Sequence, residues 1–333
     1  MKKALCLFLM VPLILFSVGA AGQKDAAGQK PVVIRAGHVN PPGEPAYEAW
    51  NVFKKIMDEK LGNRVDVQIF PQGQLGNERD LIEQVKLKSI EMTAPAVSPL
   101  AQYNPELNVL NLPYLFKNEN DLWKVVDGPI GKRFIESTKK SAGVLILNWW
   151  STGVRHIFAK KPIRSVADMR ELKIRVMENP VFIDSFRALN SLPTPMPYGE
   201  VYQALATGII DAAENDSSGY RNMKFFEVAP YYSLTAHLII PKPVLINPAF
   251  YEGLPADIRK VLDDAIVEST KFQRKLFENN FNSDIQWLKQ QKVTIVELDT
   301  AEFQRLMLPV WAKYEQNIGP GLLNDVKKVL GIQ

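Results

Sequence analysis

The sequence predicts an α/β protein made of two units with a cleft between them. Strand-like and helix-like segments alternate through residues 32–96, an order typical of a parallel sheet with right-handed crossovers. The alternation restarts after a strand-like segment at 144–150, and a strand-like segment at 238–247 leads back towards the first unit. Residues 255–291 keep a helical apolar stripe without an internal proline or glycine, and a helix of that length can lie across both units. Clefts between two such units are common ligand sites.

Hydrophobic periodicity defines the elements of the first unit. Residues 32–39 and 64–70 alternate apolar and polar side chains as half-buried strands do, whereas the apolar residues of 44–60 recur at helical spacing. Asn77 follows a glycine-containing turn and can cap the helix after it. The predicted order is strand 32–39, helix 44–60, strand 64–70, helix 78–88, short strand 91–96 and an apolar connection at 108–116.

The second unit repeats this pattern with shorter segments. After a strand at 144–150, we expect short helix 166–172, strand 173–176, helix 181–189, a helix within 194–208 and strand 209–215, before strand 238–247 leads back towards the first unit. In strand 173–176 the apolar residues alternate with Lys173 and Arg175, and Pro180 follows closely. Arg175 therefore lies either on a solvent-exposed face or in a cleft, where it can bind an anion.

Composition and charge exclude nucleic acid as an expected partner. The 333 residues are 46% hydrophobic and 23% charged, as in ordinary globular proteins, and the length suggests two domains. Lys2 and Lys3 contribute two charges to the formal net charge of +4. The remainder is too small to predict binding to nucleic acid or to a membrane surface.

The N-terminal segment has the layout of a secretory signal peptide. Two lysines precede an apolar run at 4–16, and small residues follow, so we expect a signal peptide at 1–21 and a flexible leader at 22–30. The apolar run is shorter than the ~20 residues that a membrane-spanning helix needs. Cys6 is the only cysteine and lies in this segment, so the mature chain has no disulfide, thiolate ligand or cysteine nucleophile.

Searches for catalytic and metal-binding motifs give negative results. No glycine-rich nucleotide motif follows a strand, residues 128–134 do not form a phosphate loop, and no nucleophile elbow occurs. His38, His156 and His237 are far apart without carboxylates at ligand spacing. We therefore expect no metal, no cofactor and no catalytic residue; the alternative is a catalytic triad assembled in space.

Arginine, amide and aromatic residues give the positive signals. Arg155 follows the strand expected to end at Trp150, and Arg175 follows later in the chain. A guanidinium donates two parallel hydrogen bonds to a carboxylate and stays charged at any working pH. Asn215 ends its strand and Tyr198 offers a hydroxyl or a ring face. The alternatives are surface ion pairs for the arginines and core packing for the tryptophan.

Five stretches stand out together: PQGQLGNERDLIEQV, PLAQYNPELNVLNLPYLF, GVRHIFAKKPIRSVADMRELKIRVMENP, PTPMPYGEVYQALATGIIDAAEN and FYEGLPADIRKVLDDA. They follow one another across nearly the whole mature chain, so their combination is far more specific than any one of them. Together they resemble the solute-binding proteins of tripartite ATP-independent periplasmic (TRAP) transporters, the DctP family.

The resemblance implies a periplasmic binding protein of two α/β lobes (type II-like), with a long helix spanning both lobes and a ligand cleft between them. It implies no enzymatic activity. The lobes close around an organic acid, and the closed form docks onto a membrane permease with a small DctQ-type and a large DctM-type subunit, driven by an ion gradient. The expected segments are signal peptide 1–21, leader 22–30, lobe I at 31–152 plus about 241–280, lobe II at 153–240 plus about 281–320, and a C-terminal segment at 321–333.

The resemblance also assigns site residues. The carboxylate-clamping arginine of the family falls on Arg175, and a second arginine used by many members falls on Arg155. The asparagine of the family's Gln-Glu-Asn motif falls on Asn215, and an aromatic pocket residue falls on Tyr198. The expected ligand-binding set is Arg175, Arg155, Asn215, Tyr198, Trp150, Glu78 and His38.

Two of these expectations carry qualifications in the sequence. The family's usual Gln-Glu-Asn-Pro is replaced here, with Ala213 in the first position and Asp216 in the last. Glu78 falls where other members contact hydroxyl groups, and its carboxylate could instead simply favour the start of a helix.

The residues expected in the cleft favour one substrate class. Aromatic faces and several hydrogen-bonding groups suit a polyhydroxylated sugar acid, a uronate or an aldonate. The alternative within the family is a C4-dicarboxylate or a keto acid. The alternative of another class is a periplasmic enzyme that acts on an organic acid, with Arg175 as substrate anchor and a nearby general base.

Overall fold

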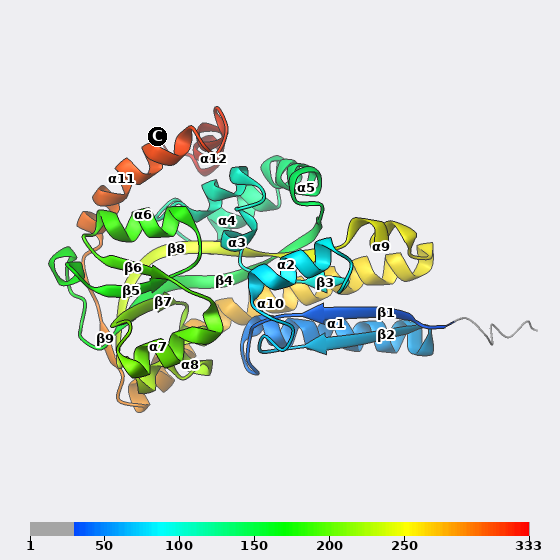
Figure 1. The fold of residues 1–333 in the computed structure, drawn as a ribbon, viewed down its shortest axis with the longest axis horizontal. Coiled ribbons are helices and arrows are strands. Elements are labelled where there is room, and N and C mark those ends of the chain that lie inside the picture. The colour runs from blue at the N-terminus through cyan, green and yellow to red at the C-terminus, as the bar shows by residue number, and fades with distance from the viewer. Residues whose placement is uncertain (1–29, 333) are drawn as a thin grey trace, which may run out of the picture. The chain divides into compact units, whose positions relative to one another are not determined.

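A computed structural model describes residues 30–332 (Figure 1). The predicted signal peptide and all but the last residue of the predicted leader lie outside the described residues. Two α/β lobes share one mixed sheet, and helices pack on it (Figure 1). Within residues 30–332, no helix combines the length and the apolar character needed to cross a membrane.

The sheet is parallel within each lobe and antiparallel at its centre. Over the described range it has nine strands in the order β2-β1-β3-β8-β4-β7-β5-β6, with β9 paired to β8. The strands are β1 (Val32–Gly37), β2 (Val65–Phe70), β3 (Met92–Thr93), β4 (Leu145–Ala159), β5 (Lys173–Val176), β6 (Leu192–Pro195), β7 (Ala212–Asn215), β8 (Tyr231–Ile246) and β9 (Thr294–Val296). Strand β1 is parallel to β2 and β3, and β5 is parallel to β6 and β7. Strand β8 is antiparallel to β3 and β4, and β4 is antiparallel to β7.

The prediction of a parallel sheet is therefore wrong at the centre. Strand β4 carries the chain from the first lobe into the second, and β8 carries it back. Because these two neighbouring strands run between the lobes in opposite directions, they pair antiparallel. The order of helices and strands within each lobe does not affect this pairing.

The long strands also change the position of Arg155. Strand β4 was expected to end at Trp150, but its pairing with β8 continues to Ala159 through register shifts on either side of Val154. Gly153 lies in the first of these irregularities with φ 69°, a conformation that glycine adopts without strain. Arg155 consequently lies inside the strand and not beyond its end.

The local signals of the first lobe are confirmed. Helix α1 (Pro45–Leu61) buries Trp50 and Phe53, as its periodicity predicts. Asn77 caps α2 (Glu78–Lys86), because its side chain accepts backbone N–H groups while Asp80 accepts the N–H of Asn77 in return. The capping box fixes where α2 begins and therefore where Glu78 projects.

Strand β6 was not expected, because Pro193 and Pro195 argue against a strand. It lies at the edge of the sheet and pairs with β5 alone, so the missing N–H groups remove little of the hydrogen-bond ladder. The helix expected within 194–208 is correspondingly shorter and consists of a 3₁₀ turn at Tyr198–Glu200 and α7 (Val201–Thr207).

Helix α10 (Ala256–Gln290) has 35 residues and confirms the predicted long helix. It packs against α1 in one lobe and against α8 in the other (Figure 1). Gln273, in its middle, accepts the backbone N–H of Ser151 and donates to the carbonyl of Ser151, at 2.8 Å each. The helix is therefore fixed to β4 where that strand crosses between the lobes.

The remaining helices cover the sheet and its ends. They are α3 (Val97–Leu100), α4 (Glu119–Val126), α5 (Pro129–Ala142), α6 (Pro180–Ala188), α8 (Ser217–Asn222), α9 (Pro248–Gly253), α11 (Ala301–Glu315) and α12 (Leu322–Leu330). Further 3₁₀ turns lie at Gly62–Arg64, Pro105–Asn111, Val166–Met169 and Phe225–Glu227. Helix α11 packs on α6, and α12 packs on α4, so the C-terminal segment lies against the sheet's covering helices (Figure 1).

Candidate functional site

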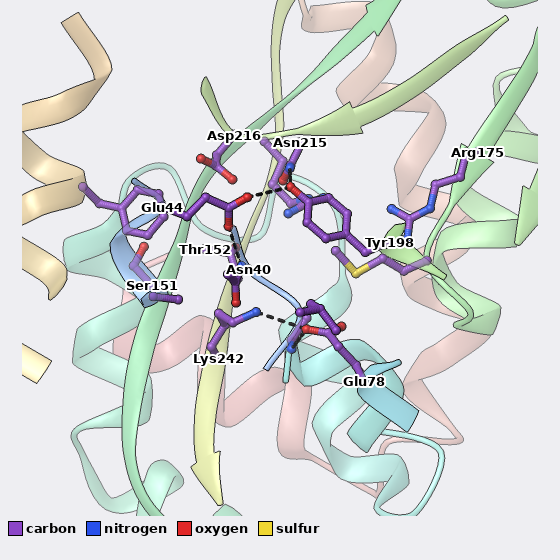
Figure 2. Close-up of a pocket in the computed structure, with 16 residues that line it drawn as sticks. Asn40, Glu44, Glu78, Ser151, Thr152, Arg175, Tyr198, Asn215, Asp216 and Lys242 are labelled. Atoms are coloured by element: carbon purple, nitrogen blue, oxygen red, sulfur yellow. Dashed lines mark hydrogen bonds and ion pairs between the residues drawn. The ribbon is translucent and has the colours of Figure 1, made fainter. Parts of the chain in front are cut away.

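A polar pocket of about 490 Å³ is lined by side chains of both lobes (Figure 2). The loop between β1 and α1 and the start of α2 line one side, β5, the 3₁₀ turn at Tyr198 and the end of β7 line the other, and the long strands β4 and β8 cross between them. Of the predicted ligand-binding residues, Arg175, Arg155, Asn215, Tyr198 and Glu78 line the pocket.

Arg175 lies buried in β5, with 4% of its surface exposed. Its Nε and Nη2 donate to the carbonyl of Met196, at 3.0 and 2.8 Å. Its Nη1 lies 3.9 Å from the carboxylate of Glu214, which is too long for a hydrogen bond. Burial lowers the pKa of Arg175, with the charge of Glu214 opposing that effect and the charge of Arg155 adding to it. The guanidinium ion of Arg175 is therefore poorly solvated, and the N–H groups on its Nη1 are still available to a ligand.

Arg155 is already neutralised by the protein. Its Nε and Nη2 donate to the carboxylate of Glu214 at 2.5 and 3.0 Å, and Nη2 also donates to the Glu214 carbonyl at 3.0 Å. Burial by itself would raise the pKa of Glu214, but the charge of Arg155, the nearby imidazole of His237 and the hydrogen bonds from Arg155 lower it to about 2. One carboxylate therefore faces two buried guanidinium groups and fully pairs with only one of them.

Tyr198 and Asn215 form a hydrogen-bonded chain that ends on a carboxyl group. The side-chain amide of Asn215 donates to the Tyr198 hydroxyl at 2.9 Å, and that hydroxyl donates to Glu44 Oε1 at 2.9 Å. A Cβ atom at Gly219 would lie 2.1 Å from Asn215 Nδ2, so the glycine leaves the space that this amide needs. The chain links β7 to the loop before α1 across the pocket.

Glu78 pairs with a lysine of β8, one of the two strands that cross between the sides of the pocket. Its Oε1 accepts from the ammonium group of Lys242 at 3.1 Å (Figure 2). The same oxygen accepts from the backbone N–H of Ala96 at 2.8 Å. Lys242 is buried in β8 between two prolines. The carboxylate of Glu78 thus does more than favour the start of α2, because it is also held at the pocket wall.

Two further carboxyl groups, Glu44 and Asp216, lie together in the pocket wall. Burial raises the pKa of Glu44, against hydrogen bonds from Asn40 and Tyr198. Burial and the neighbouring carboxyl group of Glu44 raise the pKa of Asp216 to about 7. Figure 2 shows both groups on the opposite side of the Tyr198 ring from Arg175.

Trp150 and His38 are buried and are not among the residues that line the pocket. Trp150 is fully buried, its ring edge packs on Trp50 at 5.1 Å between centroids, and its Nε1 donates to Thr270 of α10 at 3.1 Å. His38 packs face to face on Trp50, and burial together with the charge of Lys242 lowers its pKa to about 3. Both side chains belong to the core that supports the first lobe.

The arrangement suits the binding of an anion. Around Arg175 a permanent positive charge faces a cavity, and the surrounding carboxyl, amide, hydroxyl and ammonium groups can form hydrogen bonds with a polar ligand. Among residues 30–332, no group of three or more His, Cys, Asp and Glu side chains could hold a metal ion.

Comparison with known proteins identifies the family. The model of the DctP family, described as bacterial extracellular solute-binding protein, family 7, matches residues 36–317. The chain belongs to this family. Its structural neighbours are TRAP periplasmic solute-binding proteins, which bind solutes for transport and are not enzymes.

Relatives of this DctP-family chain bind different acids. The C4-dicarboxylate-binding periplasmic protein DctP of Rhodobacter capsulatus is 30% identical over 306 residues, covering 90% of this chain and 91% of that protein. A TRAP solute-binding protein of Roseobacter denitrificans with bound β-D-glucuronate is 32% identical, covers 90% of this chain and 100% of its own, and superposes with a TM-score of 0.85.

Two further structures carry an aldonate and a dicarboxylate. The sugar acid binding protein DctPAm of Advenella mimigardefordensis, in complex with galactonate, is 30% identical, covers 90% and 99% of the two chains and gives a TM-score of 0.86. A TRAP solute-binding protein of Shewanella oneidensis with bound succinate is 29% identical, with the same coverage and TM-score. Membership of the family therefore does not by itself select the substrate class.

Sequence reasoning missed several residues of the site. Lys242 and Glu214 are charged residues inside otherwise apolar strands, a signal similar to that of Arg175 between apolar neighbours. Asp216 stood out only as a departure from the family motif. Glu44 and Asn40 lie in a proline- and glycine-containing loop, where no pattern distinguishes pocket residues from solvent-exposed ones.

Proposed function

We propose that this chain captures a sugar acid, a uronate or an aldonate, and holds its carboxylate on Arg175. The observation that carries the proposal is the charge balance around Glu214: two buried guanidinium groups share one carboxylate, and the positive charge of Arg175 faces the pocket. Charged groups are buried at low cost only when they are paired. A ligand carboxylate supplies the missing partner.

The energy of such a contact is sufficient for useful affinity. Hydrogen bonds to charged groups contribute about 1.5–3 kcal/mol each. Two of them on Arg175, with neutral hydrogen bonds elsewhere in the pocket, supply much of the ~8 kcal/mol that a micromolar dissociation constant requires.

The pocket wall favours a sugar acid over a C4-dicarboxylate. Hydroxyl groups can donate to carboxyl oxygens and accept from amides or lysine, and Glu44, Glu78, Lys242 and Asn40 offer both kinds of partner. Relatives with bound glucuronate and galactonate support this substrate class, while the succinate-bound relative supports the alternative.

We further propose that the chain works in the periplasm after removal of the signal peptide at 1–21, and that it delivers its ligand to a permease with DctQ-type and DctM-type subunits. Closure would bring lobe I (31–152 and about 241–280) against lobe II (153–240 and about 281–320) around the ligand. The position of Gln273 on Ser151, where β4 crosses between the lobes, supports a hinge there.

A thermal-shift panel of the mature protein tests the substrate class. The panel contains glucuronate, galacturonate, galactonate, succinate, malate and a keto acid. A ligand at a hundred times its dissociation constant adds about 2.7 kcal/mol to the free energy of unfolding. We expect clear stabilisation by a uronate or an aldonate; stabilisation only by succinate and malate would contradict the sugar-acid assignment.

A further inference from the structure

The charges of the pocket are separated into two ends. Arg155 is paired with Glu214, and Lys242 with Glu78, by contacts of 3.1 Å or less. Arg175 lies at one end, where its positive charge has no carboxylate of the described residues within hydrogen-bond distance. At the other end, within the described part of the chain, neither Glu44 nor Asp216 forms an ion pair with a lysine, arginine or histidine.

The end with Glu44 and Asp216 is built to accept hydrogen bonds. Glu44 already accepts from Asn40 and Tyr198, and Asp216 accepts the N–H of Gly219 at 2.9 Å, so both carboxyl groups are fixed in place. The side-chain oxygen of Asn40 is buried and has no partner among the described residues, although the residue lines the pocket. A buried acceptor without a partner is costly, so a ligand that donates to it is favoured.

A second carboxylate is the wrong group for this end. It would bring a third negative group next to two buried carboxyl groups, and like charges brought together in a site cost several kcal/mol. A hydroxyl group in the same place donates its proton to one of the available oxygens and carries no charge. The same argument does not hold near Arg175, where a carboxylate relieves an uncompensated charge.

We propose that Glu44 and Asp216 are specificity-determining residues that exclude a ligand carboxylate from the end of the pocket opposite Arg175 and accept hydrogen bonds from ligand hydroxyl groups there. The site therefore takes hydroxylated monocarboxylates and rejects diacids of the same length. This inference rests on the proposed function, in which Arg175 holds the single carboxylate of the ligand. It assigns to two residues the choice between sugar acid and diacid, which family membership leaves open.

The test compares ligands that differ in one terminal group. Galactonate and galactarate have the same hydroxylated chain, but galactarate carries a carboxylate at both ends; gluconate and glucarate form a second pair. Isothermal titration of the mature protein at pH 8, above the pKa of about 7 for Asp216, should give a preference of roughly 100-fold for the monocarboxylate of the better-bound pair.

Conservative variants locate the source of that preference. Glu44→Gln keeps the side-chain length and one acceptor oxygen, and Asp216→Asn keeps a residue that caps α8 equally well. Each should reduce the preference to roughly tenfold, mainly by improving diacid binding. Glu200→Gln removes an exposed carboxylate two residues from Tyr198, outside the pocket lining, and should leave the preference unchanged.

The outcomes separate the inference from the proposed function. Equal binding of monoacid and diacid, or a preference that survives both variants, overturns the role of Glu44 and Asp216 while leaving Arg175 as the anchor. Failure of every acid to bind, or normal binding by Arg175→Ala, overturns the proposed function and the inference with it.

Discussion

Arg155 and Arg175 are the same residue in nearly the same environment, yet their surroundings assign them different roles. Both lie buried in strands, both line one pocket, and both approach Glu214. Arg155 donates hydrogen bonds to the Glu214 carboxylate, whereas Arg175 donates to the neutral backbone carbonyl of Met196. A buried arginine that the chain neutralises is part of the structure, and one that it does not neutralise is available to a ligand.

The difference follows from the pairing of strands. Strand β7 runs antiparallel to β4, with His156 opposite Asn215 and Ile157 opposite Glu214. That register brings the Glu214 side chain to Arg155 of the same strand. Strand β5 instead pairs Arg175 with Thr194 of β6, and the carbonyl of Met196 just beyond β6 is the acceptor within reach.

The largest effect should come from removing Arg175. Arg175→Ala removes a positive charge that faces the pocket and that no carboxylate of the described residues pairs at hydrogen-bond distance, so binding should weaken by about 3–6 kcal/mol, beyond detection by titration calorimetry for a micromolar ligand. The free energy of unfolding should change little or rise, because an uncompensated buried charge is lost. Normal affinity in this variant would remove the basis of the comparison.

Removal of Arg155 should instead destabilise the protein. Arg155→Ala leaves Glu214 buried without its partner, which costs about 3–5 kcal/mol of unfolding free energy measured by urea denaturation without ligand. The double variant Arg155→Met with Glu214→Gln removes both charges and should recover much of that loss. An unchanged unfolding free energy in Arg155→Ala would show that Arg155, like Arg175, is not required for the stability of the fold.

Asp216 allows a pH test of the other end of the pocket. Its pKa is raised from 3.8 to about 7 in the folded protein, so the folded state holds this proton where the unfolded state has lost it. The stability that this proton contributes is full below about pH 4 and is lost as the pH rises through 7. Glu44 of the loop before α1 and Asp284 of α10 add to the shift, and Arg155 of β4 opposes it.

The suitable range is pH 5 to pH 8, because Glu214 is ionised there in both the folded and the unfolded state. Its lowered pKa of about 2 therefore contributes a constant stability over this range. Over that range, the unfolding free energy of the ligand-free protein should fall by roughly 2–3 kcal/mol relative to Asp216→Asn. Parallel pH profiles for the two proteins would mean that Asp216 is ionised throughout.

The smallest effect, and the most specific, concerns hydrogen-bond geometry. Arg175→Lys keeps a positive charge but replaces the planar fork with a single ammonium group. Ligand affinity should fall by roughly 10- to 100-fold, less than in Arg175→Ala, with thermal stability almost unchanged. Equal affinity in the lysine variant would show that charge alone, without a paired hydrogen-bond geometry, holds the ligand.

The sequence by itself determined those features that depend on local chemistry. Apolar periodicity located β1, β2, α1 and the 35-residue α10, and the Asn77 cap located the start of α2, because each signal acts over a few neighbouring residues. The five motif stretches led to the family, which the comparison then confirmed. A charged residue set between apolar residues of a strand also drew attention to Arg175 before its surroundings were known.

Tertiary structure decided everything that depends on partners distant in the chain. Only the antiparallel crossing of β4 and β8 placed Arg155 inside a strand and next to Glu214, and only the packing of α1 and α10 placed Trp150 in the core. The meeting of Glu44 with Asp216 brings together residues more than 150 positions apart. Whether a buried charge is neutralised depends on distances of a few ångströms, and only the assembled sheet sets those distances.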